Sequence, residues 1–270
     1  PETAKLECDN RGFNYGDAAF ETLKYTSGRL LFWEEHYFRL MATMRILRME
    51  IPMNFTMEFL EQEIIETVRA SGLSDQACRI KFIVNRKSGG LYTPLTNEID
   101  YLIKASPIES GPYMMRDQGV KMELYKDYFM PPGLLSNLKT NNRLINILGG
   151  IYAQDQEVDN CFILNTAKMV IEALNGNVFL IKGNTIKTPP LIDGCLKGIM
   201  RNQIIEIIGS DDDLDLDESS ISPFELQKAD EIFITNVISG IVPVSQYRKK
   251  TYSKDTSLSI LAKLNSKVFA

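Results

Sequence analysis

The chain has 270 residues, of which 44% are hydrophobic and 24% are charged, and its formal net charge is -5 at pH 7. A chain of this length can bury a substantial hydrophobic core without disulfide bonds or a structural metal ion. Its negative charge argues against nucleic acid as a partner. Four widely spaced cysteines without a C-x-x-C pair argue against a zinc site and a secreted disulfide framework, so we expect no metal ion. The sequence lacks an N-terminal basic region followed by an apolar run, and no apolar run approaches the roughly 18 residues that span a bilayer. We therefore expect a cytoplasmic protein that does not bind a membrane.

The first part of the sequence is predicted to form a sheet covered by helices. Alternating apolar residues indicate strands, and apolar residues at helical spacing indicate helices. The elements expected here are a hairpin over residues 22–32, helices over 34–49 and from an N-cap at Thr56 to Gly72, and strands over 79–85 and 99–104. Ahead of the hairpin, Arg11–Asp17 contains two glycines among aromatic residues, which suggests tight backbone close to a site.

A second domain is expected after a linker. Residues 106–118 contain two prolines and a glycine, which favours a connection between domains. We predict an N-terminal domain over residues 1–107, a linker over 108–118 and a C-terminal domain over 119–270. The elements expected beyond the linker are strands over 120–124, 161–164, 178–181 and 231–235, a hairpin turn at Gly183-Asn184, and helices after Leu144, over 198–208, from a capping box at Ser222, and over 258–268. The acidic run 211–218 lacks EF-hand spacing and is predicted to be a solvated loop.

Lys139 stands in the polar stretch Ser136–Asn142, just ahead of the apolar-periodic run that begins at Leu144. Because the sequence has a single histidine, His36, an enzyme of this sequence must use a lysine or a carboxylate for most proton transfers. A lone lysine before a helix is more often a solvated surface residue. Its interpretation as a reactive amine therefore depends on companion motifs.

Several of these companions suit a phosphate. Gly198 precedes the helix that opens with Ile199 and Met200, and free N–H groups at a helix N-terminus favour an anion. A helix that merely begins at a glycine explains this stretch equally well. Further candidates are the guanidinium of Arg39, the backbone of Asn175 and Gly176, and Asn236 at the end of an apolar strand.

Glu172 lies in an apolar neighbourhood, and a buried carboxylate needs a partner. A protonated ring nitrogen meets this need, and so does an arginine. A phosphorylated aldehyde on a pyridine ring satisfies the lysine, the helix N-terminus and the acidic residue together. The cofactor that fits is pyridoxal 5′-phosphate (PLP).

Six motifs in order resemble the class IV aminotransferase family, the fold type IV PLP enzymes. They are R-G-F-x-Y-G-D-x-x-F-E at Arg11–Glu21, H-x-x-R-L at His36–Leu40, L-K-x-x-N-R-L at Leu138–Leu144, E-x-x-x-x-N-V-F at Glu172–Phe179, G-I-M-R at Gly198–Arg201 and A-D-E-I-F at Ala229–Phe233. The resemblance extends from Arg11 to about Val244 and implies a two-domain α/β fold, with a smaller N-terminal domain, a larger C-terminal domain and the cofactor between them.

The resemblance also implies roles for single residues. Lys139 is implied to form the Schiff base and carry protons, Glu172 to face the pyridine nitrogen, and Arg39 to bind phosphate with the backbone of Ile199 and Met200. It implies a homodimer as well. Two departures stand out: the chain begins ten residues before Arg11, where family members usually have another strand, and Asn175, Gly176 and Val237 stand where many members have serine or threonine.

The reaction expected from the resemblance is amino-group transfer to a 2-oxo acid or the 4-amino-4-deoxychorismate lyase reaction, which yields 4-aminobenzoate and pyruvate. The motif wording looks most like the lyases. Branched-chain or D-amino-acid aminotransferases, and a PLP-binding protein without turnover, remain alternatives. We expect Tyr15, Phe20 and Tyr92 to line the substrate site, although core packing explains Phe20 as well. Arg79, Lys81 and Arg86 are candidates for binding a substrate carboxylate, and we select Arg86 among them.

Overall fold

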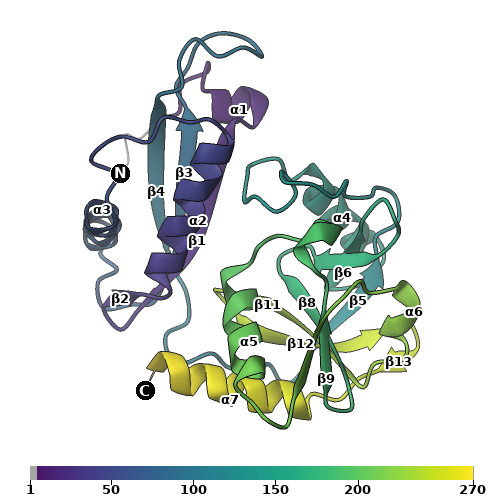
Figure 1. Cartoon of the computed structure of the whole chain (residues 1–270). Coiled ribbons are helices and arrows are strands. Elements are labelled where there is room, and N and C mark those ends of the chain that lie inside the picture. The colour runs from purple at the N-terminus through teal and green to yellow at the C-terminus, as the bar shows by residue number, and fades with distance from the viewer. Residues whose placement is uncertain (1–4, 270) are drawn as a thin grey trace. The chain divides into compact units, whose positions relative to one another are not determined.

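The computed structural model describes residues 5–269, and its internal contacts divide the mixed α/β chain into two units (Figure 1). Unit 1 comprises the residues up to Gly111 together with Lys139–Asn142. Unit 2 comprises Pro112–Leu138 and the residues from Arg143 onward. The four-residue segment that carries Lys139 therefore packs with unit 1, although both of its neighbours in the chain belong to unit 2. The predicted linker over residues 108–118 stays a prediction.

Unit 1 is built on a four-stranded antiparallel sheet with the strand order β2-β1-β3-β4. Its elements in chain order are α1 (Arg11–Tyr15), β1 (Ala18–Thr26), β2 (Arg29–Leu30), α2 (Trp33–Ile46), α3 (Met57–Ala70), β3 (Cys78–Arg86) and β4 (Ile99–Pro107). Ser27 and Gly28 both have positive φ between β1 and β2, the backbone that a tight hairpin turn requires. The hairpin, both helices and both later strands are confirmed, whereas the short helix α1 was not predicted.

Helices α2 and α3 cover one face of this sheet (Figure 1). The strands direct alternate residues to that face, and Leu23, Ile80 and Phe82 are almost fully buried there with Leu40 of α2 and Leu60 of α3. Phe20 has the opposite parity from Leu23 and therefore lies on the other face of β1. This alternation decides which side chains of unit 1 remain available to a ligand.

Unit 2 contains a nine-stranded sheet with the order β10-β9-β8-β11-β12-β5-β6-β7, and β13 pairs with β12. The strands are β5 (Val120–Leu124), β6 (Asn160–Leu164), β7 (Val170–Ala173), β8 (Asn177–Lys182), β9 (Thr185–Thr188), β10 (Asp215–Glu218), β11 (Glu231–Asn236), β12 (Gly240–Tyr247) and β13 (Lys250–Thr251). The helices are α4 (Leu144–Asp155), a 3₁₀ turn η1 (Leu191–Asp193), α5 (Ile199–Gly209), α6 (Pro223–Leu226) and α7 (Asp255–Phe269). Only three residues connect β7 to β8. These two strands are the first and last of the series β8-β11-β12-β5-β6-β7, so the short connection brings the two ends of that series close together.

Most elements predicted for this part are confirmed, including the β8–β9 hairpin turn and the capping box of Ser222 and Glu225 at α6. The prediction for the acidic run was wrong in part. Asp215–Glu218 forms β10, which pairs in parallel with β9, and Glu218 accepts a hydrogen bond from the buried Arg201 at 2.6 Å. The strands β7, β12 and β13 were not predicted.

No helix within residues 5–269 is long and apolar enough to cross a membrane. In the same part of the chain, no group of three or more histidine, cysteine, aspartate or glutamate residues is placed to hold a metal ion.

Candidate functional site

Lys139 is fixed by its backbone to the edge of β1. Phe20 N–H donates to the Lys139 carbonyl at 2.8 Å, Asn141 N–H donates to the Ala18 carbonyl at 3.0 Å, and Thr140 bridges Ala19. This edge is open to the segment because β2 pairs only with the last two residues of β1. The Lys139 amine lies 4.6 Å from the centre of the Phe20 ring. The sheet thus fixes the backbone of Lys139, and its amine lies over the Phe20 ring on the same strand edge.

Arg39 of α2 belongs to a buried ionic group with Glu21 of β1 and His36. Arg39 donates from Nε to Glu21 Oε1 at 2.8 Å and from Nη2 to Oε2 at 2.5 Å, a two-point contact. His36 Nδ1 lies 2.7 Å from Glu21 Oε2. Burial raises the pKa of Glu21, but the charge and hydrogen bond of Arg39 and the hydrogen bond of His36 more than offset this and lower it to about 2. Glu21 is therefore ionised and fixes the orientation of the Arg39 guanidinium.

His36 does not supply a proton carrier. Burial lowers its pKa, although Glu21 opposes the shift, so the ring is neutral at pH 7. Because an ionised Glu21 only accepts hydrogen bonds, Nδ1 carries the proton and donates. Nε2 is buried and has no hydrogen-bond partner among the described residues. With its ring 1% exposed, the single histidine is structural.

Glu172 lies in β7, opposite Ile163 of β6, and is only 5% exposed. Its Oε2 accepts a hydrogen bond from Leu196 N–H at 2.9 Å. Leu196 is three residues ahead of Ile199, the first residue of α5. The carboxylate is therefore tied to the same short segment that leads into the predicted phosphate site.

The N-terminus of α5 is assembled from three backbone segments. Gly198 is the N-cap residue and has no side-chain cap, so the first N–H groups of the helix, those of Ile199 and Met200 among them, lack the usual intrahelical acceptors. Asn177 donates from Nδ2 to the Leu196 carbonyl at 2.8 Å, and a Cβ on Gly198 would lie 2.0 Å from Asn177 Oδ1. A Cβ on Gly176 would lie 2.7 Å from the Thr235 carbonyl, so these segments pack without room for side chains. Unit 2 thus packs the backbone of Gly176 against Thr235, and its neighbour Asn177 against the Gly198 start of α5.

Two other predicted cofactor residues have local partners. Asn236 Oδ1 accepts hydrogen bonds from the N–H groups of Ile238 and Ser239 at 3.0 and 2.9 Å, which shapes the turn between β11 and β12. Asn175 Oδ1 accepts from Asn160 Nδ2 at 2.9 Å. Their side-chain oxygens are thus engaged within the protein, at the turns where these residues lie.

The features of unit 2 fit PLP. Glu172 offers a buried carboxylate, and the α5 N-terminus offers N–H groups that have no acceptor among residues 5–269, in a setting where glycines let the backbone segments approach closely. A buried acid and an anion site joined by one short segment match a cofactor with a basic ring nitrogen and a phosphate.

Three of the predicted substrate residues, Tyr15, Arg86 and Tyr92, line one cavity of about 300 Å³ in unit 1. The Tyr15 and Tyr92 rings pack edge to face at 5.9 Å. The cavity also takes in Thr140, the neighbour of Lys139, whereas Phe20 does not line it. Further lining residues that sequence reasoning did not assign to the site are Arg11, Gly16, Asp17, Ala18, Leu47, Pro94 and Asn142. The R-G-F-x-Y-G-D motif contained the signal for Arg11 and Asp17.

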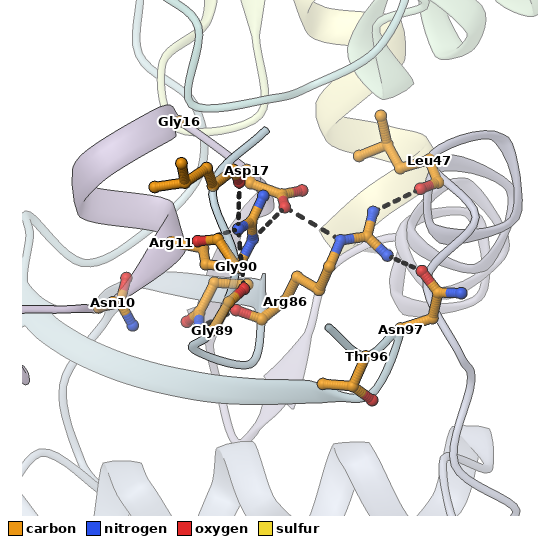
Figure 2. Close-up of polar contacts among 12 residues, drawn as sticks. Asn10, Arg11, Gly16, Asp17, Leu47, Arg86, Gly89, Gly90, Thr96 and Asn97 are labelled. Carbon is orange, nitrogen blue, oxygen red and sulfur yellow. Dashed lines mark hydrogen bonds and ion pairs between the residues drawn. The ribbon is translucent and has the colours of Figure 1, made fainter. Parts of the chain in front are cut away.

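Arg86, the predicted carboxylate ligand, is occupied by the protein itself (Figure 2). Its guanidinium donates from Nε to Asp17 at 3.0 Å, from Nη1 to the Arg48 carbonyl and Asn97 Oδ1 at 3.1 and 2.6 Å, and from Nη2 to the Leu47 carbonyl at 2.7 Å. These contacts favour a structural role at the end of β3. The other two candidates, Arg79 and Lys81, lie in β3, and the Lys81 amine is 4.9 Å from the Phe20 ring centre.

Comparisons with known proteins identify the family of this chain. Residues 18–247 match the family described as amino-transferase class IV. The chain is 28% identical to a putative branched-chain-amino-acid aminotransferase of Methanocaldococcus jannaschii, covering 98% of this chain and 90% of the relative. It is 26% identical to an aminodeoxychorismate lyase of Vibrio harveyi, over 87% of this chain and 85% of the relative.

Among solved structures, the 4-amino-4-deoxychorismate lyase of Pseudomonas aeruginosa superimposes with a TM-score of 0.82 at 26% identity, covering 98% of this chain and 96% of that one. The fold is that of the fold type IV PLP enzymes. The chain therefore belongs to the class IV aminotransferase family and is a PLP-dependent enzyme.

Proposed function

We propose that this enzyme is a 4-amino-4-deoxychorismate lyase in which Lys139 is the catalytic residue. The observation that carries the choice of reaction is the lining of the cavity beside Thr140, where two arginines, two tyrosines and an asparagine stand beside Asp17 and three aliphatic residues, Ala18, Leu47 and Pro94. The lyase substrate is a ring that bears carboxylates, and aromatic and cationic groups suit it. A branched-chain side chain calls for an apolar pocket instead.

When bound, PLP supplies an aldehyde for amines and a ring that takes up electrons from the substrate. We propose that Lys139 carries the cofactor through its amine and that the Glu172 carboxylate keeps the ring nitrogen protonated. The N–H groups of Ile199 and Met200, with the backbone of Asn175, Gly176 and Asn236, would bind the phosphate. The orientation that Glu21 gives to Arg39 supports the guanidinium as a further phosphate ligand.

Proton transfer falls to Lys139 in this proposal. The only histidine is buried and neutral, so no imidazole competes for the role. A freed Lys139 amine would remove the proton from the substrate carbon that bears the amino group. In the lyase reaction, pyruvate then leaves and the ring becomes aromatic.

Transamination is the second candidate, because the archaeal relative that covers 98% of this chain is described as a putative branched-chain aminotransferase. The two reactions are separated by their products. With aminodeoxychorismate as the only substrate and no 2-oxo acid added as amino acceptor, the lyase forms 4-aminobenzoate and pyruvate in equal amounts. Formation of glutamate from branched-chain amino acids and 2-oxoglutarate, without 4-aminobenzoate, would contradict the lyase proposal.

We also propose a homodimer. The exposed side of α4 carries Leu144, Ile147, Leu148 and Ile151, an apolar stripe at helical spacing. We expect light scattering to give twice the mass of one chain, and Ile147→Glu to halve the measured mass. Gln154→Glu on the exposed end of the same helix is the control and should leave the mass unchanged. A wild-type mass of 30.6 kDa would contradict the dimer.

A cytoplasmic location is part of the same proposal. All four cysteines are free thiols, one of them exposed, which suits a reducing compartment. Cell fractionation tests this location.

A further inference from the structure

The cavity in unit 1 carries an excess of positive charge. Asp17 Oδ2 accepts from Arg11 Nε at 2.9 Å and from Arg86 Nε at 3.0 Å, so one carboxylate is shared by two guanidiniums (Figure 2). All three residues line the cavity, and their two positive charges exceed the single negative charge by one. Both arginine side chains are less than a tenth exposed. A cavity of this kind favours an anion.

The two arginines differ in the donors that remain. Arg86 uses all three of its nitrogens on protein acceptors. Arg11 donates from Nε to Asp17 and from Nη1 to the carbonyls of Gly89, Gly90 and Leu91 at 3.1, 3.3 and 2.7 Å. Its Nη2 has no hydrogen-bond partner among residues 5–269. Nη2 is not among the fully buried nitrogens that lack a partner, so it is accessible to water or to a ligand that brings an acceptor.

Aromatic rings stand beside this donor. The Arg11 guanidinium lies 4.9 Å from the centre of the Tyr15 ring, and Tyr15 packs against Tyr92. Tyr92 is 92% exposed and Tyr15 38% exposed, so both rings are accessible to a ligand. A flat ring with a carboxylate would place its face against the tyrosines and its charge on Arg11.

We propose that Arg11 binds a carboxylate of the substrate through Nη2, in the cavity that it shares with Tyr15 and Tyr92. The identification of that carboxylate as one carried by a ring rests on the proposed lyase function. Arg11 also anchors the loop Gly89–Leu91, so its replacement affects both the loop and the charge. A test must separate these two effects.

Binding of matched acids and amides to the PLP-loaded enzyme provides that separation. The probes are 4-aminobenzoate with 4-aminobenzamide, and 4-methylpentanoate with its amide, titrated by calorimetry. In Arg11→Gln, we expect the acid to bind about ten- to a hundredfold more weakly, which is the contribution of one charge-assisted hydrogen bond, while the amide changes much less. Asp17→Asn is the matched control, because it weakens the hydrogen bonds that hold Arg11 and Arg86 in place and retains both cations; the preference for the acid should persist.

The outcomes distinguish the two proposals. If the aliphatic acid binds better than the aromatic one and Arg11→Gln abolishes its advantage over the amide, the carboxylate site stands and the lyase proposal fails. If acid and amide weaken equally in Arg11→Gln, Arg11 only holds the loop and the inference is overturned. It is overturned too if no acid binds the wild-type enzyme better than its amide.

Discussion

Three buried charged residues give the sharpest tests of the proposed site and of the stability of the fold. Glu21, Glu172 and Arg11 are each 5% exposed or less, and each is held by hydrogen bonds from or to neighbouring groups. Burying a charge costs free energy unless partners compensate for it, so each of these residues has a partner that can be tested.

The pKa of Glu21 predicts a change in stability at acidic pH. Its folded pKa of about 2 lies below the ordinary value of 4.5, so the stabilisation is present above pH 4.5 and is lost as the pH falls towards 2. We expect Glu21→Gln to cost about 3–5 kcal/mol of unfolding free energy at pH 7, as for other broken buried ion pairs. The difference from wild type should shrink by about 3 kcal/mol across this pH window.

Urea denaturation at a series of pH values measures this difference. Glu58→Gln, at an exposed position in α3, removes a carboxylate without a buried partner and serves as the control. A wild-type advantage over Glu21→Gln that stays constant from pH 7 down to pH 2 would contradict the assignment.

Glu172 is predicted to act through its charge. Glu172→Gln keeps an oxygen that accepts from Leu196 N–H but loses the negative charge opposite the ring nitrogen, so kcat should fall by about 10²–10³-fold with little loss of stability. Glu231→Gln is a matched control, because Glu231 is also buried in unit 2 but accepts hydrogen bonds from Thr256 and Ser257 at the start of α7. That variant should lose stability and retain kcat. A Glu172→Gln enzyme with wild-type kcat would refute the role.

At the scale of elements, sequence patterns predicted correctly those helix ends that are stabilised by residues close by in the chain. Thr56 caps α3 by accepting from Phe59 N–H at 3.2 Å, and the Ser222–Glu225 capping box starts α6, as their sequence patterns predict. The acidic strand β10 could not be predicted in this way. Its stability comes from parallel pairing with β9, some thirty residues earlier in the chain, and charge patterning carries no signal for that partner.

The start of α5 gives a prediction at this scale. Gly198 has an ordinary negative φ, so alanine would be unstrained there, but its Cβ would displace Asn177 and the Leu196 carbonyl that Asn177 holds. We expect Gly198→Ala to raise the Kd for PLP about tenfold, the effect of one lost neutral hydrogen bond. Gly150→Ala in α4 meets no atom within 4 Å and should leave PLP binding unchanged while stabilising the helix by up to about 1 kcal/mol. Equal PLP affinities in the two variants would contradict this account.

At the scale of the whole molecule, the sequence motifs predicted the family, and the spacing of apolar residues predicted most of the helices and strands. Which side chains bond to one another within each unit could be seen only in the structure. The motif order was enough to propose Lys139, Glu172 and Arg39, because each stands in a recognisable pattern. The occupation of Arg86 by Asp17, Leu47 and Asn97 depends on contacts between distant segments, and alternation alone did not show which way it faces.

The placement of Lys139 is a further example. Its backbone pairs with β1, more than a hundred residues earlier, although the chain on both sides belongs to unit 2. Nothing in the local sequence indicates this edge pairing, because the segment contains only polar turn residues. The long-range pairing nevertheless supports Lys139 as a functional residue, since a solvated turn lysine needs no such fixed backbone.

Borohydride reduction of the purified yellow enzyme, followed by peptide mass spectrometry, tests the central claim that Lys139 carries the cofactor. We predict a phosphopyridoxyl group on the peptide that contains Lys139, and its absence from that peptide in Lys139→Ala, which should also lack turnover with aminodeoxychorismate. A label on another lysine, or full turnover by Lys139→Ala, would contradict the account.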